Sequence, residues 1–404
     1  MHSFSSALVM ARTRTPDNPV ACYRLAAVDR ALKFFQRNFP GTILYSVKTN
    51  PDLVVLDELY ANGVRSFDVA SIAETQLIAE RFPDARICYM HPVKSRASIR
   101  QTYFEYGVRV YTLDTADELE KIMASTDNAN DLTLLVRLSV PNTHSEMNLS
   151  EKFGVSFSEA PDLMLQVRKK AKRVGVCFHV GSQCMNPAAY GIAIGMAGDL
   201  IKASGVMIDI LDVGGGFPSV YANMMPPAMI DYMQEINASF EEIPASGACE
   251  LWAEPGRALV AEAGSTVARV ELRRGDRLYL NDGTHGSLFD AGTPGFVFPV
   301  RAVRLRGKLS PKLIPFTFYG PTCDGLDYMK GPFLLPADIH ESDYVEIGNT
   351  GAYGACLRTR FNGYGVHDAA LLKDAPVMTM YGDRAGRGKA KQLRGSTVTP
   401  FPRP

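Results

Sequence analysis

The sequence predicts a (β/α)8 barrel followed by a mainly antiparallel β domain. Short β-rich runs alternate with helix-like segments through the first two thirds of the 404 residues. Near Ser265 the long helices stop, and strands separated by Gly, Pro and Asp turns follow one another. The chain is also long enough for one large barrel with an appended domain.

Eight runs in the first part have the length and the β-branched, aromatic composition of strands. They are TILYSVK (42–48), SFDVAS (66–71), RICYMH (86–91), RVYTLD (109–114), LTLLVRLSV (132–140), VCFHVGS (176–182), DILDVGG (209–215) and LWAEPG (251–256). Segments between them, such as PDLVVLDELYANG (51–63) and ADELEKIMAST (116–126), have the pattern of helices. An open, doubly wound sheet would show similar alternation, but the count of eight favours the barrel.

The second part is predicted to be a β domain. Its strand-like runs are TVARVELRR (266–274), RLYLND (277–282), FPVRAVRLRG (298–307), IPFTFYG (314–320), YVEIGN (344–349) and VMTMYG (377–382). We expect the barrel to span 25–264, and 1–24 to join 265–404 in the β domain. The first residues are expected to be frayed or to form a strand. The basic tail, 383–404, is expected to be a flexible or loosely docked end.

Composition excludes several classes of function. Lys+Arg and Asp+Glu both number 43, so nothing favours nucleic acid or an anionic membrane as a partner. No apolar run has the length of a membrane-spanning helix, and no basic region precedes the short apolar patch at the start, so no secretory signal is expected. The seven cysteines form no CxxC pair, which predicts free thiols in the cytoplasm and no metal site.

Polar residues stand repeatedly at the ends of the predicted barrel strands. They are Lys48, Asp68, His179, Asp212 and Glu254. One such residue is more often a solvated strand end or a satisfied core side chain than a functional group. Several at the same end converge on one mouth of a barrel, where functional groups collect.

Two glycine-containing loops follow predicted strands. Gly214, Gly215 and Gly216 lie in DVGGGFP, and Gly256 and Arg257 lie in EPGRALV. Consecutive glycines allow backbone N–H groups to approach an anion, and an arginine adds a charge-assisted hydrogen bond to phosphate. The spacing is not that of a dinucleotide fingerprint. The loops therefore suggest one small phosphate, although a triple glycine alone is also typical of a tight turn.

Lys48 gives these features a common chemistry. A lysine in an enclosed site loses proton affinity and becomes a nucleophile for a carbonyl. A phosphate site, such a lysine and the carboxylate of Glu254 together suggest pyridoxal 5'-phosphate (PLP), with Glu254 at the pyridine nitrogen. His179 is expected to stack on the ring face.

Eight stretches carry a specific resemblance. They are YSVKTN (45–50), SFDVASIAE (66–74), EKFGV (151–155), FHVGSQC (178–184), DVGGGFP (212–218), AEPGRALV (253–260), GPTCDGLD (320–327) and GAYGACLRTRFNGYG (351–365). In this order they resemble the fold-type III PLP-dependent basic amino-acid decarboxylases, the group of eukaryotic-type ornithine decarboxylase. The resemblance implies an alanine racemase-like fold and a head-to-tail homodimer whose active sites lie at the subunit interface.

The resemblance also assigns roles. It implies that Lys48 binds PLP covalently, Glu254 meets the pyridine nitrogen and His179 stacks on the ring. The phosphate-binding residues would be Ser182, Gly215, Gly216, Gly256, Arg257 and Tyr353. Asp68 and Glu74 would be acids near Lys48 and the ring. Three residues would complete the partner's site, namely Cys323, Asp324 and Phe361.

The expected reaction is decarboxylation of L-ornithine to putrescine and CO2. Cys323 would protonate the α-carbon, and Asp324 would bind the side-chain ammonium. The family's second acid for that amine lies in a Tyr-Asp-His segment. Here the region reads GSLFDAGTPGFVFPV (286–300), and Asp290 is nearby but out of register.

Several alternatives therefore stay open. Within the class they are lysine or dual ornithine/lysine decarboxylase, decarboxylase of a modified ornithine, and the diaminopimelate and carboxynorspermidine decarboxylases. The diaminopimelate enzymes typically have Cys-Glu-Ser where this chain has Cys323, Asp324 and Gly325, which argues against them. A non-catalytic regulatory paralogue and an alanine racemase-like PLP protein are the rivals from other classes. Lys48, Glu254, Arg257 and Cys323 together argue against the regulatory paralogue.

Overall fold

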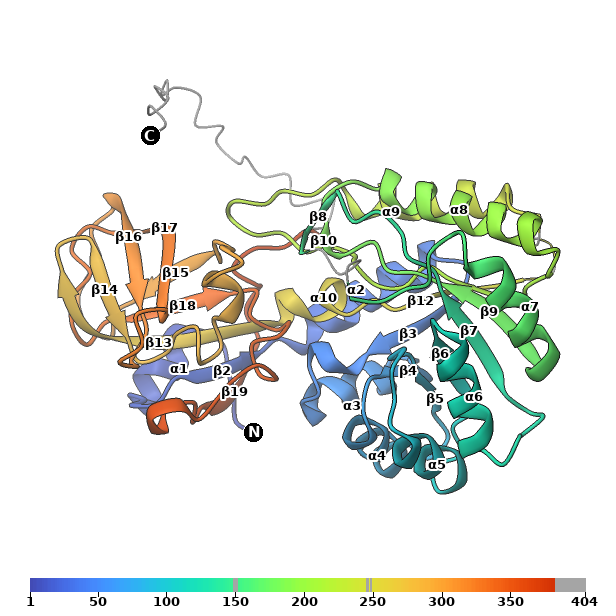
Figure 1. Ribbon diagram of the computed structural model, residues 1–404. Coiled ribbons are helices and arrows are strands. Elements are labelled where there is room, and N and C mark those ends of the chain that lie inside the picture. The colour runs from blue at the N-terminus through green and yellow to red at the C-terminus, as the bar shows by residue number, and fades with distance from the viewer. Residues whose placement is uncertain (148–151, 245–246, 248, 382–404) are drawn as a thin grey trace.

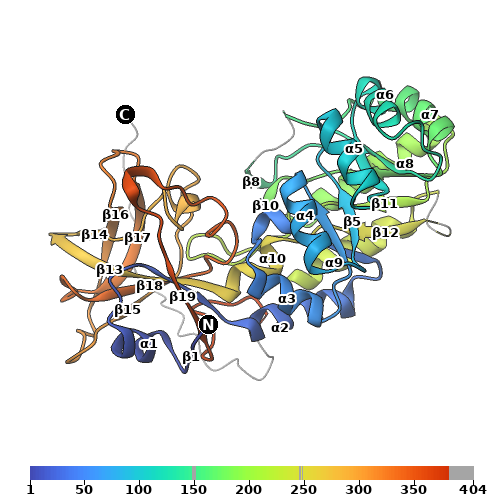
Figure 2. The same ribbon diagram turned by 90° about the horizontal axis from the view of Figure 1, so that it is seen from below.

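The computed structural model describes residues 1–147, 152–244, 247 and 249–381. A closed barrel of parallel strands forms one end of the molecule and a mainly antiparallel sheet forms the other, with α10 (Arg257–Val260) between them (Figure 1, Figure 2). Both parts of the predicted fold class are confirmed. Closure of the barrel excludes the open sheet.

All eight predicted barrel strands are present. In chain order they are β3 (Thr42–Ser46), β4 (Ser66–Val69), β5 (Arg86–Tyr89), β6 (Val110–Leu113), β7 (Thr133–Arg137), β9 (Arg173–Cys177), β11 (Ile210–Asp212) and β12 (Glu250–Ala253). The barrel closes where β12 pairs with β3. A short antiparallel pair, β8 (Ser145–Met147) and β10 (Ser182–Cys184), lies outside the barrel.

Helices cover the outside of the barrel. They are α2 (Leu25–Asn38), α3 (Leu53–Ala61), α4 (Ile72–Arg81), α5 (Arg96–Phe104), α6 (Ala116–Ser125), α7 (Ala160–Lys170), α8 (Ala188–Ser204) and α9 (Met229–Glu241). The helices predicted over 51–63 and 116–126 are confirmed as α3 and α6. Helix α6 begins where the Thr115 hydroxyl accepts a hydrogen bond from the N–H of Glu118 at 3.1 Å, a typical N-cap.

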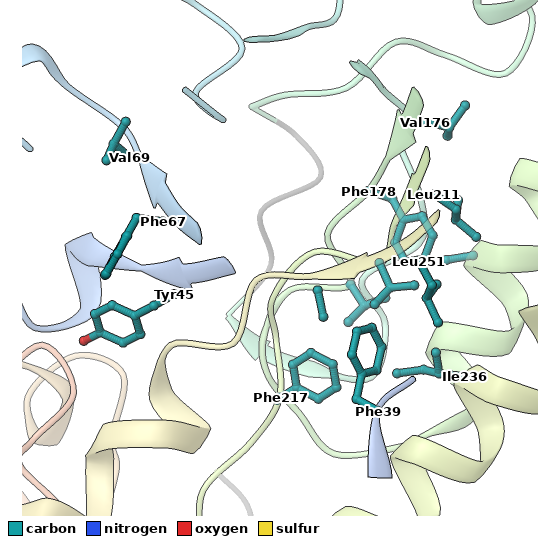
Figure 3. Close-up of a cluster of buried hydrophobic side chains, with 14 of the residues drawn as sticks. Phe39, Tyr45, Phe67, Val69, Val176, Phe178, Leu211, Phe217, Ile236 and Leu251 are labelled. Atoms are coloured by element: carbon teal, nitrogen blue, oxygen red, sulfur yellow. The ribbon is translucent and has the colours of Figure 1, made fainter. Parts of the chain in front are cut away.

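The hydrophobic core of the barrel part has two layers, because successive side chains of a strand point to opposite faces. Figure 3 shows part of the outer layer, in which Phe67, Phe178 and Leu211 on or next to strands lie in one cluster with Phe217 and Ile236. The inner layer takes one or two side chains from most strands: Leu44, Cys88, Met90, Val110, Leu135, Cys177, Ile210 and Trp252. Burial of each large apolar side chain contributes roughly 1.5–3 kcal/mol, so the two layers hold the strand ends at the mouth in place.

The β domain is a nine-stranded sheet. Its strands are β1 (Ser3–Phe4), β2 (Val20–Tyr23), β13 (Gly264–Arg274), β14 (Arg277–Leu280), β15 (Val300–Val303), β16 (Leu313–Tyr319), β17 (Tyr328–Pro336), β18 (Tyr344–Gly348) and β19 (Asp368–Leu372). The N-terminal strand β2 pairs with both β13 and β19. We propose 25–264 as the barrel domain and the rest of the chain as the β domain.

Three details of the β domain differ from the prediction in whole or in part. The part of the predicted strand 377–382 that the structure describes forms no strand; instead the N–H of Met380 donates to the Glu262 carboxylate at 2.6 Å. Strands β17 and β19 were not predicted. The start of the chain forms the expected strand as β1, but helix α1 (Ala7–Arg14) follows it and was not predicted; Ser6 caps this helix, and its apolar residues are buried. The tail 383–404 lies outside the described residues.

No helix within the described ranges has the length and apolar character needed to cross a bilayer. Among the same residues, no three His, Cys, Asp or Glu side chains are grouped as ligands of a metal ion. The seven cysteines are free thiols.

Candidate active site

Lys48 lies at the mouth of the barrel on a single 3-10 turn, Val47–Thr49, directly after β3. Its Nζ donates to the Oδ2 atom of Asp68 at 2.8 Å, and the Ser46 hydroxyl donates to the same oxygen at 2.6 Å. Asp68 is buried, whereas 43% of the Lys48 side chain is exposed. The amine is therefore positioned by a buried carboxylate and still accessible to a small molecule.

The charge state of Lys48 differs from the sequence-based expectation. Desolvation alone lowers the pKa of the amine, but the negative charges of Asp68 and Glu254 outweigh it and raise the pKa above its ordinary value. The prediction that enclosure lowers the proton affinity is therefore wrong for this arrangement. Lys48 is an ammonium at neutral pH, and it must pass a proton to a neighbour before it can act as a nucleophile.

Glu254 and Asp212 form a second acidic pair at the strand ends. Burial, with repulsion from Asp212 and Asp68, raises the pKa of Glu254 well above its usual range. Burial raises the pKa of Asp212 to about 7, although one of its oxygens accepts the N–H of Gly214 at 2.8 Å. At neutral pH this pair holds a proton. Such a pair can present a protonated or an ionised carboxyl to a basic ring nitrogen.

His179 follows β9 and is neutral. Burial and the nearby cations Arg137 and Lys48 lower the pKa of its ring. Its Nδ1 accepts the N–H of Gly181 at 3.0 Å, so the proton is on Nε2. A Cβ atom added to Gly215 would lie 3.1 Å from Nε2, which places the ring directly against the glycine loop.

The glycine loop requires its glycines. Gly214 and Gly216 have positive φ values of 66° and 100°, and a Cβ on Gly214 would lie 2.0 Å from the carbonyl oxygen of Phe178. Among the described residues, the N–H groups of Gly215 and Gly216 have no hydrogen-bond acceptor. Two adjacent free N–H donors are a typical anion-binding arrangement.

Arg257, the first residue of α10, is buried beside this loop. One of its Nη atoms donates to Asp290 at 2.9 Å and to the Tyr221 hydroxyl at 2.8 Å. The other Nη of Arg257 lies 3.5 Å from the Ser182 hydroxyl. The buried Nε of Arg257 has no partner among the described residues. The guanidinium therefore keeps donor capacity for an anion.

Asp290 has a defined place in the structure. Asp290 and Arg257 form a buried ion pair. The sequence placed Asp290 only near the family's second substrate acid, out of register. In the structure its carboxylate balances the charge of the predicted phosphate-binding arginine.

Tyr353 connects the β domain to the barrel mouth. Its N–H donates to the carbonyl oxygen of Thr49, next to Lys48, at 2.8 Å, and its ring lies 5.0 Å from the Arg257 guanidinium. The amide of Asn50 donates to the carbonyl oxygen of Gly351 at 2.8 Å. The segment after β18 is thus bound to the turn that carries Lys48.

Glu74 has a structural partner at the start of α4. Its carboxylate accepts the N–H of Ala70 at 2.7 Å, and its own N–H donates to the Ser71 hydroxyl at 3.2 Å. Burial raises its pKa, and the charges of Asp68 and Lys48 act on it from nearby. Glu74 therefore supports the position of the strand end that carries Asp68.

The remaining predicted residues, Cys323, Asp324 and Phe361, lie in a separate group on the β domain. With their contacts His285 and Asn362 they form what we call the distal cluster. The Cys323 thiol lies 3.3 Å from the amide oxygen of Asn362, and Asp324 pairs with His285 at 2.8 Å. The rings of His285 and Phe361 are 5.1 Å apart. Within the described part of the chain, no hydrogen bond or ion pair joins the cluster to Lys48, Asp68 or Glu254.

Several contacting residues were not predicted from the sequence. They are Ser46, Tyr221, His285 and Asn362, and Asp290 as the partner of Arg257. Asn362 adjoins Phe361 in RFNGYG, so the motif pointed to it. The others contact residues that are distant in the chain, and such contacts carry no local signal.

The barrel mouth fits PLP. The free N–H groups of Gly215 and Gly216 and the partnerless Nε of Arg257 suit a phosphate. The accessible amine of Lys48 suits an aldehyde, and Glu254 suits a ring nitrogen.

Comparisons with known proteins show the family of this chain. The family described as "Pyridoxal-dependent decarboxylase, pyridoxal binding domain" matches residues 25–261. A lysine/ornithine decarboxylase of Selenomonas ruminantium is 30% identical over 89% of this chain and 90% of its own length. An ornithine decarboxylase of Panagrellus redivivus is 31% identical over 89% of this chain and 87% of its own length. The solved lysine/ornithine decarboxylase of Vibrio vulnificus, in complex with cadaverine, has a TM-score of 0.77 and 31% identity over 92% of this chain and all of that one. The chain therefore belongs to the fold-type III pyridoxal-dependent decarboxylases and is a PLP-dependent decarboxylase of basic amino acids.

Proposed function

We propose that the protein decarboxylates L-ornithine to putrescine and CO2, with L-lysine as the nearest alternative substrate. The observation that carries this proposal is Asp324, an acid next to the Cys323 thiol in the distal cluster. An acid beside the proton donor suits a substrate with a second amine a few bonds from its α-carbon. The relatives named as ornithine and lysine/ornithine decarboxylases support the same substrate class.

PLP, when bound, supplies an electron sink for the pair released as the bond to the carboxylate breaks. Arg257 and the N–H groups of Gly215 and Gly216 would bind its phosphate, with Ser182, Gly256 and Tyr353 around it. Glu254 would hydrogen-bond to the ring nitrogen, and His179 would pack on the ring face through a neutral imidazole. Together these residues would hold the cofactor at the barrel mouth.

Proton transfers belong to Lys48, Asp68 and Cys323. Asp68 holds the Lys48 ammonium and is the base nearest to it, at 2.8 Å. After CO2 leaves, the Cys323 thiol gives its proton to the substrate α-carbon, and solvent restores it. One proton is taken up for each CO2 released, which balances the reaction.

A second copy of the chain completes each site. Among the described residues, no hydrogen bond or ion pair joins the distal cluster to Lys48, Asp68 or Glu254 of its own chain, and Phe361 is 45% exposed. A head-to-tail dimer would bring Cys323, Asp324 and Phe361 of one subunit to the Lys48 of the other. This arrangement makes the site a property of the homodimer.

The test is CO2 release from L-ornithine, L-lysine, L-arginine and diaminopimelate by the purified protein with PLP. We expect the highest kcat/KM for L-ornithine. A preference for L-arginine or diaminopimelate would contradict the proposed substrate. The Lys48→Ala protein serves as the background control.

A further inference from the structure

The distal cluster contains a histidine that no step above uses. Nε2 of His285 lies 2.8 Å from Oδ2 of Asp324, and each side chain is 30% exposed. The other oxygen of Asp324 accepts the N–H of Leu326 at 3.0 Å. The carboxylate is thus fixed on one oxygen by its own loop and on the other by His285.

His285 is itself held in place from two sides. Its carbonyl oxygen accepts the N–H of Thr359 at 2.9 Å, which ties it to the segment that leads to Phe361. Its ring lies 5.1 Å from the ring of Phe361 at an angle of 43°. The imidazole therefore joins the predicted substrate acid to the predicted aromatic wall of the same site.

We propose that His285 is a specificity-determining positioning residue, which orients Asp324 toward the distal ammonium of the substrate and weakens that contact when the imidazole is protonated. The inference rests on the proposed function. A neutral imidazole donates one hydrogen bond and leaves the full negative charge on Asp324. An imidazolium forms an ion pair with Asp324, and the charge available to a substrate ammonium falls.

Among the charged groups near His285, Asp324 is the one whose interaction depends on the charge of the imidazole. The hydrogen bonds from Leu326 and His285 lower the pKa of Asp324, which keeps this carboxylate ionised. Other titratable or charged side chains in the neighbouring segments include Asp282, Asp290, Cys323, Asp327, Cys356, Arg358, Arg360, Tyr364 and His367. Asp290 pairs with Arg257 at 2.9 Å. Asp282 pairs with His367 at 3.2 Å, and Asp327 accepts the N–H of Thr284 at 2.7 Å. Of the carboxylates in the described residues, only that of Asp324 contacts the His285 ring.

The experiment compares KM for L-ornithine in wild type and His285→Gln between about pH 6 and about pH 8. Glutamine keeps a donor for Asp324 but does not titrate. On acidification, KM of the wild type should rise roughly threefold to fivefold relative to the variant, the size expected for loss of a partly exposed charge pair. The kcat ratio should stay constant. The substrate ammonium and every other ionising group affect KM equally in both proteins, so their effects cancel in the ratio of the wild-type KM to the variant KM.

Two controls make the outcome decisive. His340→Gln changes an exposed histidine 3.9 Å from Asp343 and should keep the wild-type profile. His285→Asn replaces His285→Gln if the latter does not melt cooperatively. Identical pH profiles of KM for the wild type and the folded His285 variant would overturn the inference. Absence of CO2 release by the wild type at every pH would instead overturn the proposed function.

Discussion

The barrel mouth and the distal cluster solve different electrostatic problems. At the mouth, the acids Asp68, Asp212 and Glu254 surround one lysine, and burial raises the pKa of two of them. In the distal cluster, Asp324 stays ionised because it is partly exposed and hydrogen-bonded. The comparison teaches that burial favours protonated carboxyls at the mouth, whereas partial exposure and hydrogen bonds keep an ionised carboxylate in the cluster, which suits its proposed role in recognition. Four experiments can break or sharpen this difference.

The largest effect is expected from Lys48→Ala at the mouth. Loss of the amine removes the proposed covalent attachment point of PLP and should lower kcat by at least roughly 10³-fold. Measurement of CO2 release tests this. Lys33→Ala, which removes an exposed lysine paired with Asp29 at 2.8 Å, is the control and should retain full activity. A Lys48→Ala enzyme with near wild-type turnover would remove Lys48 from the mechanism.

Mixing two dead variants tests whether the mouth and the cluster act across subunits. Cys323→Ala should also be nearly inactive. Random pairing of equal amounts with Lys48→Ala makes about half the dimers heterodimers, each with one intact site of two, so activity should return to roughly a quarter of wild type. Mass measurement under native conditions confirms subunit exchange. If exchange occurs and activity does not return, both residues act within one chain.

Arg257→Ala should weaken PLP binding without loss of the fold. Hydrogen bonds from a charged group contribute roughly 1.5–3 kcal/mol, so the dissociation constant should rise about 10-fold to 100-fold. Titration of the apoprotein with PLP by fluorescence measures it. Arg81→Ala, which breaks an exposed pair with Asp57, is the control. Unchanged affinity would mean that the glycine loop binds the phosphate alone.

The smallest effect is expected on the pH dependence of stability, through the protonation of Asp212. The pKa of Asp212 is about 7 in the folded state and lower when unfolded, so its contribution to stability is present at low pH and is lost as pH rises toward 7. Asp212→Asn should remove this pH-dependent part of the free energy of unfolding, which amounts to on the order of 1–3 kcal/mol. Urea unfolding at several pH values tests it, with Asp209→Asn as control. Parallel stability curves for Asp212→Asn and wild type would contradict a protonated pair.

The sequence predicted the barrel well because each strand has its own local pattern. The polar residues Lys48, Asp68 and Glu254 were expected at one mouth, and the structure brings them together. Strand β17 escaped prediction because Gly331 and Pro332 interrupt it, and these residues usually argue against a strand.

Contacts between residues far apart in the chain could not be predicted from the sequence either. Arg257 and Asp290 are 33 positions apart, and His285 and Asp324 are 39 apart. No periodicity links such pairs. The pKa of Lys48 was misjudged for the same reason, because it depends on how many acids surround the amine and not on enclosure alone.

The bonds from Tyr353 to Thr49 and from Asn50 to Gly351 have a consequence for protein engineering. They make the turn that carries Lys48 a shared part of both domains. A chimera that takes its barrel from this chain and its β domain from a relative would therefore need a matched segment after β18. Exchange of whole domains to change substrate preference is thus constrained by this contact between the domains next to Lys48. Grafts confined to the outer loops of the β domain are the better starting point.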